Sequence, residues 1–370
     1  MKAFLILEDG TVFEGTHIGA DKEIISEIVF NTSMAGYLEV LTDPSYAGQA
    51  VCMTYPLIGN YGICRDDCES ERPWPDGFIV RELSRIPSNF RCDCTIQEYL
   101  EENGVPGIAG IDTRALTKIL REKGTMNGMI TTNEAYDLNE VLPKLKAYTT
   151  GKVVEKVTCK EKYVVNPTTD LAQNGPLSGA ARFDKEAYEK GVREPKPALV
   201  TELSGQGLKV ALLDLGAKRN IARSLAERGC EVTVYPAGTP AQEIIDDNPD
   251  GIMLSNGPGD PKECTGVIAE IKKLYDTEIP IFAICLGHQL MALATGADTH
   301  KMKYGHRGGN HPVKDLMTGR VYISSQNHGY VVDTDKLDPS VAVPAFINVN
   351  DGTNEGPVSY THLRAHETSA

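Results

Sequence analysis

The stretch 279-IPIFAICLGHQLMALATG-296 decides the fold of the second half of this 370-residue chain. Ile279 to Ile284 is a short apolar run with β-branched residues, which predicts a strand buried on both faces. Cys285 follows directly, and the apolar residues after it recur with the period of a helix, which is predicted to end at Gly296. The pattern therefore places a cysteine on a sharp strand-to-helix turn.

A cysteine at such a turn has two interpretations. It can be a small core residue, as most free cysteines after an apolar run are. It can also be a nucleophile that stands clear of the sheet edge, where the first free N–H groups of the following helix favour the thiolate. The Leu-Gly-His-Gln that follows Cys285 favours the nucleophile.

Strands and helices alternate regularly around this turn, from Leu208 onward. Strands are predicted at 209–216, 231–236, 251–255 and 279–284, and helices at 219–228, 241–246 and 267–275. This rhythm predicts a parallel sheet with helices on both faces. Ligands of such sheets bind at the carboxyl ends of the strands, where the loops 256–261 and 285–289 meet.

The first part of the chain, residues 1–155, has the pattern of a separate strand-rich α/β domain. An Asp-Gly turn predicts an opening hairpin, and further strands are predicted at 27–30, 50–54 and 77–81. Helices are predicted at 96–102 and from the N-cap Asp112 to the stop at Gly124. Residues 156–207 are rich in Pro, Gly and Asn and form the expected inter-domain connection, with one short helix at 183–190.

Composition excludes several classes of function. The formal net charge of −14 argues against a nucleic-acid surface, which needs basic residues to neutralise phosphates. We expect a cytoplasmic protein, because there is no secretory signal at Met1 and no apolar run long enough to span a bilayer. The nine cysteines lack the paired spacing of a zinc site, so reduced thiols are expected.

The loop Gly257-Pro258-Gly259 lets backbone approach a ligand closely, since glycine has no Cβ. By itself it is a common turn. Next to a thiolate, however, backbone N–H groups suit acyl transfer, because they stabilise the oxyanion formed by attack on a carbonyl. The N–H groups of Leu286 and Gly257 are the natural donors.

Several segments resemble a known family. The C-terminal half resembles the class I glutamine amidotransferases in SNGPGDP (Ser255 to Pro261), AICLGHQL (Ala283 to Leu290), KMKYGHRGGNHPV (Lys301 to Val313) and SQNHGYVV (Ser325 to Val332). The N-terminal half resembles the small, glutamine-hydrolysing subunits of carbamoyl-phosphate synthases in VFNTSMAGYLEVLTDPSYAGQ (Val29 to Gln49), TYPLIGNYG (Thr54 to Gly62) and GIAGIDTRALTKILREKGTMNG (Gly107 to Gly128). The fold implied for residues 208–356 is the flavodoxin-like, mostly parallel amidotransferase domain.

The resemblance implies a role for each matching residue. Cys285 attacks the side-chain amide of glutamine, and the N–H groups of Gly257 and Leu286 hold the oxyanion. The glutamine pocket is formed by Ser45, reaching across from the N-terminal domain, with Gly257, Gly259, Leu286, Gln289, Asn327, Gly329 and Tyr330. The implied partner is a large subunit that holds ATP, magnesium and bicarbonate; no cofactor is expected in this chain, which also lacks a phosphate loop of the G-x-x-x-x-G-K type.

The sequence departs from the family near its end. The family's general base is a histidine in a His-Pro-Glu motif, and this motif does not occur in the chain. We interpret residues 357–370 as a foreign or frame-shifted tail, so that the closing strand and helix of the domain would be missing and glutaminase activity strongly impaired. His362, His366 and Glu367 stand in the wrong context to replace the motif. Ala283 stands where the family often has glycine, a smaller departure.

Other interpretations stay open. The segments that contain His306, His311 and His328 are rich in glycine, and we interpret them as loops. No metal is expected there, because no two of these histidines have the spacing of metal ligands on a helix. His288 is expected to pack or cap in the first helical turn. A non-catalytic interaction subunit is one rival function. An amidotransferase serving guanylate or anthranilate synthesis is another, although those glutaminases lack the N-terminal domain found here.

Overall fold

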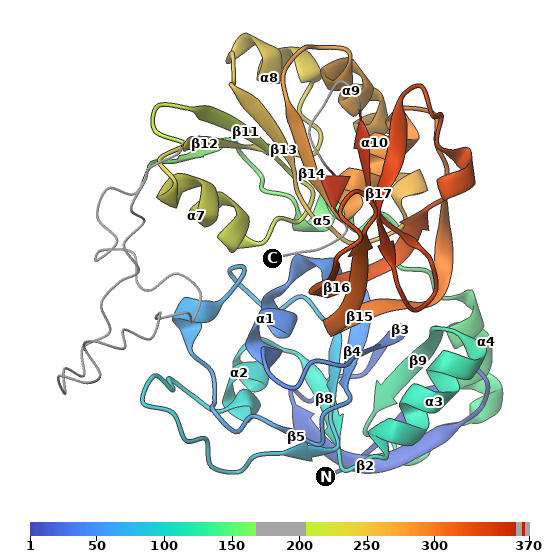
Figure 1. Ribbon diagram of the computed structural model, residues 1–370. Helices are drawn as coiled ribbons and strands as arrows, with labels where there is room; N and C mark the ends of the chain where they lie inside the picture. Colours follow the sequence, from blue (N-terminus) through green and yellow to red (C-terminus); the bar gives the residue numbers. More distant parts are fainter. Residues whose placement is uncertain (168–204, 360–364, 367–370) are drawn as a thin grey trace.

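A computed structural model describes residues 1–167, 205–359 and 365–366. Figure 1 shows an N-terminal body below and a C-terminal body above, with the strands β15 and β16 reaching down to their boundary. The short helix expected at 183–190 lies outside the described residues. No helix in the described ranges is both long and apolar enough to cross a membrane.

The N-terminal body is a closed barrel, which runs in the order β1-β2-β8-β6-β4-β3-β9. Its strands are β1 (Lys2–Leu7), β2 (Val12–Gly19), β3 (Ile24–Asn31), β4 (Gln49–Met53), β6 (Gly77–Ile79), β8 (Pro106–Ala109) and β9 (Met126–Thr131), with β5 (Leu57–Ile58) and β7 (Glu82–Leu83) pairing separately. Its helices are α1 (Tyr37–Thr42), α2 (Ile96–Glu102), α3 (Thr113–Lys123) and α4 (Leu138–Ala147), with short 3-10 turns at Pro44–Tyr46 and Arg65–Asp67. The next helix, α5 (Val154–Val157), packs through Val154 into the core of the C-terminal body. The predicted hairpin is β1 and β2, paired antiparallel.

The predicted ends of the helices follow from local chemistry. Asp112 accepts a hydrogen bond from the Ala115 N–H at the start of α3, and Gly124 ends that helix with φ of +102°. Thr95 and Glu98 form a reciprocal capping box at the start of α2. Both helices therefore begin where the sequence predicts.

The C-terminal body is built on a six-stranded sheet in the order β10-β12-β11-β13-β14-β19. The sheet contains β10 (Tyr163–Val165), β11 (Lys209–Asp214), β12 (Glu231–Pro236), β13 (Gly251–Leu254), β14 (Ile281–Ile284) and β19 (Ala365–His366), and the helices are α7 (Arg219–Glu227), α8 (Ala241–Asp246), α9 (Thr265–Tyr275) and α10 (Leu286–Ala294), with a 3-10 turn at Pro261–Glu263. One apolar cluster joins α8, α9 and α10 to one face of the sheet. A second cluster joins α7 to the other face, so helices cover both faces as expected.

Two edges of this sheet differ from expectation. Residues 163–165, which we expected in an irregular connection, form the strand β10 and pair antiparallel with β12. We also expected the closing strand of the sheet to be missing, yet β19 pairs in parallel with β14 through two residues. Both strands are edge additions, which depend on the backbone groups exposed by a neighbouring strand more than on their own sequence.

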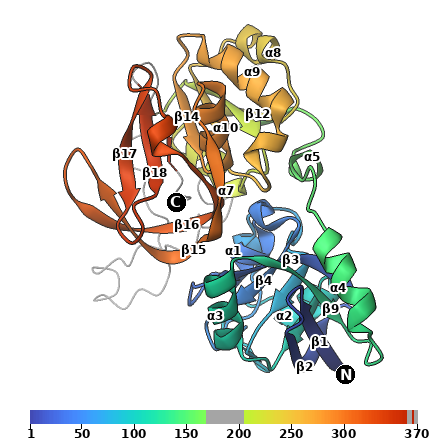
Figure 2. The same ribbon diagram turned by 90° about the vertical axis from the view of Figure 1, so that its right-hand side faces the viewer.

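The remaining strands form a second closed barrel beside α10, shown in red and orange in Figure 2. They are β15 (Thr299–Asp315), β16 (Val321–Val332), β17 (Ala342–Asn348) and β18 (Asn354–Ser359), all paired antiparallel, with a 3-10 turn at Thr334–Lys336. The interpretation of His306, His311 and His328 as loop residues was wrong, because they lie on β15 and β16. Glycines and bulges hide the strand period there.

Candidate active site

Cys285 stands on the predicted turn between β14 and α10. Its backbone has φ of +49° and ψ of −111°, and Cys285 is one of two non-glycine residues with positive φ in the part of the chain that is described. Such strain concentrates at functional sites. The turn also requires Gly287, because a Cβ there would lie 2.6 Å from the Leu254 carbonyl oxygen. The sulfur lies 3.5 Å from the Asn327 carbonyl oxygen of β16.

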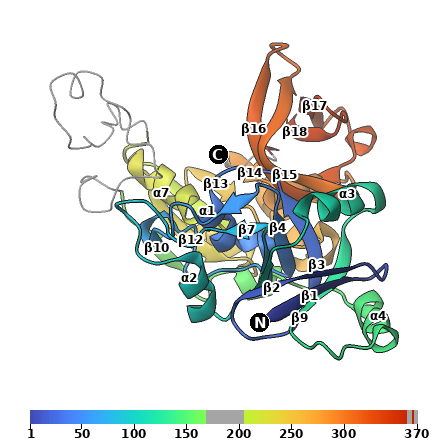
Figure 3. The same cartoon turned by 90° about the horizontal axis from the view of Figure 1, so that it is seen from below.

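Cys285 lines a cavity between the two bodies. The empty volume of this cavity is about 680 Å³ when the part open to solvent is included. Figure 3, seen from below, shows β3 and β4 of the N-terminal body close to β15 of the C-terminal body at this boundary. All the pocket residues predicted from the sequence except Leu286 line the cavity: Ser45, Gly257, Gly259, Gln289, Asn327, Gly329 and Tyr330. The structure brings these residues together, while their individual roles stay predictions.

Gly257 and Leu286, the two predicted oxyanion donors, are in contact. A Cβ built on Gly257 would lie 2.2 Å from the Leu215 carbonyl oxygen and 2.8 Å from Leu286 Cδ2. Only glycine fits at this close approach. Since Leu286 directly follows Cys285, the loop 256–261 lies against the cysteine turn.

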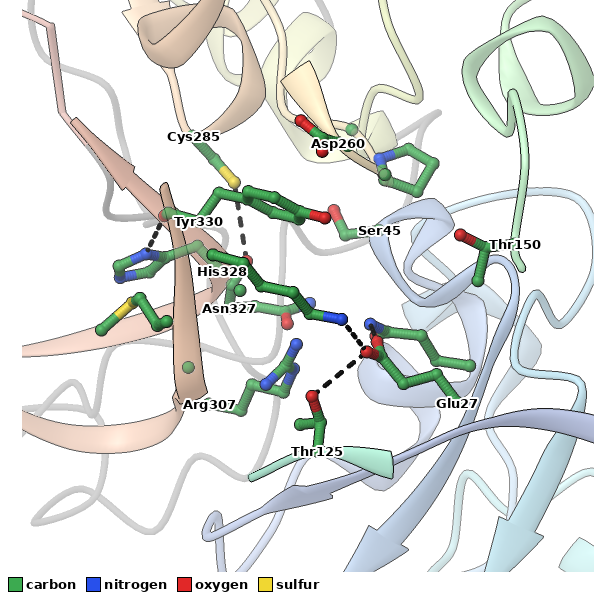
Figure 4. Close-up of a pocket in the computed structure, with 18 of the residues that line it drawn as sticks. Glu27, Ser45, Thr125, Thr150, Asp260, Cys285, Arg307, Asn327, His328 and Tyr330 are labelled. Carbon is green, nitrogen blue, oxygen red and sulfur yellow. Dashed lines mark hydrogen bonds and ion pairs between the residues drawn. The ribbon is translucent and has the colours of Figure 1, made fainter. Parts of the chain in front are cut away.

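Asp43 links the two bodies at the site. One carboxylate oxygen accepts the Ser45 N–H at 2.9 Å, and the other accepts the Asn327 side-chain amide at 3.0 Å and pairs with Lys218 Nζ at 3.3 Å. Ser45 Oγ in turn accepts the Asn256 amide at 2.9 Å. Ser45 therefore does reach across the boundary, as Figure 4 shows beside Cys285 and Tyr330.

Lys218 is a buried cation at this site, because its side chain is only 16% exposed. Burial by itself would lower the pKa of Lys218, but the carboxylates of Asp43 and Glu69 outweigh burial and raise it. Cys285 also acts on it electrostatically. A positive charge near the sulfur favours its thiolate form.

The opposite side of the cavity carries a second set of charges, and Figure 4 shows Glu27, Thr125 and Arg307 there. Glu27 accepts hydrogen bonds from Thr125 and Gln49 and pairs with Lys301 Nζ at 2.5 Å. Burial by itself would raise the pKa of Glu27, but Lys301 and then Arg307 lower it. This end of the cavity thus offers both signs of charge.

Gln289 and Tyr330 close the third side. The Gln289 side-chain amide donates to the Tyr330 carbonyl oxygen at 2.9 Å, which ties α10 to β16. Burial and the neighbouring Asp260 carboxylate raise the pKa of the Tyr330 phenol. Tyr330 therefore stays neutral at physiological pH and contributes a hydroxyl group rather than a charge.

Known families match both bodies. Residues 5–130 match the family described as "Carbamoyl-phosphate synthase small chain, CPSase domain", and residues 211–362 match "Glutamine amidotransferase class-I". The "Carbamoyl phosphate synthase small chain" of Clostridium perfringens is 49% identical over 356 residues, which cover 96% of this chain and 90% of that protein. The chain belongs to the carbamoyl-phosphate synthase small chain family.

A second relative agrees with this assignment. The carbamoyl phosphate synthase small chain of Fusobacterium nucleatum is 47% identical over 352 residues, covering 95% of this chain and 87% of that protein. Among solved structures, a glutamine amidotransferase from Thermotoga maritima matches with a TM-score of 0.36 and 17% identity, over 44% of this chain and 75% of that chain.

Three charged residues at the site of this chain were not singled out from the sequence: Asp43, Lys218 and Glu27. Asp43-Pro44 does carry a local signal, since an acidic N-cap before proline is typical of a short helical turn. Lys218 and Glu27 carry none, because each is an ordinary charged residue next to a predicted helix or within a predicted strand.

His288 lies in the first turn of α10 and is completely buried, which agrees with its predicted packing role. All nine cysteines lie in the described ranges and are free thiols. Burial raises the pKa of several of them, such as Cys52 and Cys230, and it raises the pKa of Cys264 to about 11. Such thiols are structural, in contrast to Cys285, which lines the cavity.

Proposed function

We propose that the chain releases ammonia from glutamine at Cys285 and passes it to a large subunit that makes carbamoyl phosphate. The observation that carries this proposal is the placement of Cys285 on a strained turn at a cavity shared with Ser45 and Gly257. Membership of the small chain family supports both the substrate and the need for a large-subunit partner.

The proposed chemistry is acyl transfer. The Cys285 thiolate attacks the side-chain carbonyl carbon of glutamine, and the oxyanion receives hydrogen bonds from the Gly257 and Leu286 N–H groups. The C–N bond then breaks, and the nitrogen leaves as ammonia after taking up a proton. Water hydrolyses the remaining thioester to glutamate and frees the sulfur.

The charged side of the cavity supports an amino acid as substrate. Glutamine carries an ammonium and a carboxylate on its α-carbon. Glu27 offers a partner for the ammonium, whereas Lys301 and Arg307 offer partners for the carboxylate, and all three line the cavity. Buried polar groups of this kind reject analogues that lack the matching charge.

The remaining components belong to the partner in this proposal. ATP, magnesium and bicarbonate bind the large subunit, no cofactor binds this chain, and the pair works in the cytoplasm. Ammonia would feed carbamoyl phosphate synthesis for arginine or pyrimidines. The chain's net charge of −14 also favours a protein partner over nucleic acid.

The 370-residue polypeptide has no His-Pro-Glu motif, and we propose that its glutaminase activity is impaired. General acid–base catalysis typically contributes about 10²- to 10⁴-fold to a rate, so a loss of this size is expected in comparison with a homologue that has the motif. The same absence favours one alternative, a subunit that binds the large partner without hydrolysing glutamine.

Two measurements test the proposal on the purified chain, by itself and with a large subunit. Diazo-oxo-norleucine, a glutamine analogue with an electrophilic carbon, should alkylate Cys285, and Cys285→Ser should abolish the labelling. Cys264→Ser, at a thiol outside this cavity, should leave it unchanged. Complex formation without any labelling would establish the non-catalytic alternative. Ammonia release equal to that of an intact homologue would refute the impairment alone.

A further inference from the structure

A buried polar cluster lies next to the segment 327–330 of β16. The histidine–glutamate cluster consists of His306 on β15, His328 on β16 and Glu355 on β18. Their exposed fractions are 4%, 3% and 0%, and one nitrogen or oxygen of each lies within 4.8 Å of the others. A fully buried carboxylate needs compensation by charge or hydrogen bonds to be tolerated.

Glu355 receives that compensation from both histidines. One carboxylate oxygen lies 3.1 Å from His306 Nδ1, and the other lies 3.4 Å from His328 Nε2. Asn348 adds a hydrogen bond at 3.1 Å. Burial by itself would raise the pKa of Glu355, but the hydrogen bonds with His306 and His328 outweigh it and hold the pKa far below its ordinary value. The group is therefore a permanent anion at neutral pH.

His328 connects this anion to the cavity. Its Nδ1 lies 2.9 Å from the Tyr330 carbonyl oxygen, which is also the acceptor of the Gln289 amide. The residue before it, Asn327, contributes the carbonyl oxygen that lies 3.5 Å from the Cys285 sulfur. Figure 4 shows the His328 ring directed away from Glu27 and Thr125. The segment 327–330 thus approaches Cys285 through Asn327 and Glu355 through His328.

The strand needs such support because its ladder is irregular here. Lys301 pairs with Tyr330, but the next pair along the ladder is His306 with His328, so residues 302–305 bulge out of register. A second irregularity follows between Gly308 and His311. Bulges disrupt ladder hydrogen bonds locally. Only three residue pairs lie between these two irregularities, and the first of them is His306 with His328, the two histidines that Glu355 joins.

We propose that Glu355 is a positioning residue, whose carboxylate fixes His328 and thereby places the backbone of residues 327–330 against Cys285. This inference rests on the proposed glutamine chemistry at Cys285. A substrate must fit between that backbone and the sulfur, where a displacement of about 1 Å can cost on the order of 100-fold in rate.

The test compares carboxylate-to-amide variants with two alkylating agents. Glu355→Gln keeps the shape and removes the charge, and Asp335→Asn makes the same change at an exposed residue of the same body. We expect Glu355→Gln to slow labelling of Cys285 by diazo-oxo-norleucine about 10- to 100-fold. Labelling by iodoacetamide, which needs no glutamine pocket, should change less than about threefold, and Asp335→Asn should change neither rate.

A milder variant covers the case in which Glu355→Gln fails to fold. Asp351 pairs with the outer nitrogen of His306 at 2.8 Å and is partly exposed, so Asp351→Asn should slow the analogue in the same direction by a smaller factor. Glu355→Asp, which restores the charge on a shorter arm, should recover part of the rate. This rescue distinguishes positioning from a general loss of structure.

Three results would overturn the inference. One is equal labelling of wild type and Glu355→Gln by the analogue. Another is equal slowing with both reagents, which indicates a purely structural role. The third is one tightly bound divalent metal ion per wild-type chain that is lost in Glu355→Gln, which would make the cluster a metal site. Failure of the wild type to react with the analogue at all overturns the proposed function instead, and the inference with it.

Discussion

Replacing Lys218 by methionine should destabilise the chain strongly and slow the reactions of Cys285. The side chain of Lys218 is 16% exposed, and its partner Asp43 is 4% exposed. Glu69, the second carboxylate that acts on it, is 6% exposed. Methionine fills a similar volume without the charge, so the variant leaves two buried carboxylates without their cation.

The magnitude follows from that burial. Removing one partner of a buried ion pair typically costs about 3–5 kcal/mol, because the remaining charge stays buried and uncompensated. The double variant Lys218→Met with Asp43→Asn removes one of the stranded charges and should recover part of this loss. Denaturant unfolding of the wild type, the single variant and the double variant measures both values.

The same variants test the electrostatics of the sulfur. Loss of the cation disfavours the Cys285 thiolate, so alkylation by iodoacetamide at neutral pH should slow in the single variant. The exposed pair Lys2 and Glu14 provides a matched control, since Lys2→Met should change neither stability nor alkylation appreciably. Unfolding within about 1 kcal/mol of the wild type, together with unchanged alkylation, would refute the assignment of Lys218 as a buried cation at the site.

Two further predictions concern Gly257 and His311, whose ring lies 4.9 Å from that of His306. Gly257→Ala should slow labelling by the glutamine analogue at least about tenfold, because the added Cβ would lie 2.2 Å from the Leu215 carbonyl oxygen. The control variant Gly266→Ala in α9, where an added Cβ meets open space, should not slow it. Equal labelling rates for the two variants would contradict the close approach at Gly257. Burial, with the rings of His306 and His328 adding to it, lowers the pKa of His311 to about 4. As the pH drops, His311 therefore takes up a proton in the unfolded chain at a higher pH than in the folded chain. The free energy of unfolding should fall between pH 6.5 and 4, by about 1–2 kcal/mol for this partly exposed residue. Chemical denaturation at several pH values checks this, and a slope unchanged in His311→Gln would contradict it.

Local features of the chain were predictable because their causes are local. The Asp112 cap, the Gly124 stop and the alternation of strands and helices from Leu208 depend on residues within one or two turns of each other. Cys285 belongs to this class too, since a buried run, a cysteine and Leu-Gly lie within one short stretch. The predicted bounds of α2, α8 and β12 agree with the structure for that reason.

The antiparallel barrel β15–β18 and its histidines were not predictable in the same way. Glycines and two bulges interrupt the period of two on which strand prediction depends, so Gly-rich text was interpreted as loops. The spacing of metal ligands on a helix could not show that His306 and His328 lie close together, because both residues are on strands. They meet across a ladder, and the carboxylate that joins them comes from a third strand.

The sequence by itself determined that Cys285 stands on a strand-to-helix turn and that the Gly257 loop follows the preceding strand of the sheet, because each feature lies within one contiguous motif. Only the tertiary structure decided which charges surround the sulfur. Asp43 meets Asn327 across a sequence separation of 284 residues, and Lys218 lies buried beside both Asp43 and Glu69. Such pairings are properties of the folded packing, where low polarity makes a charge costly unless a distant segment supplies its partner.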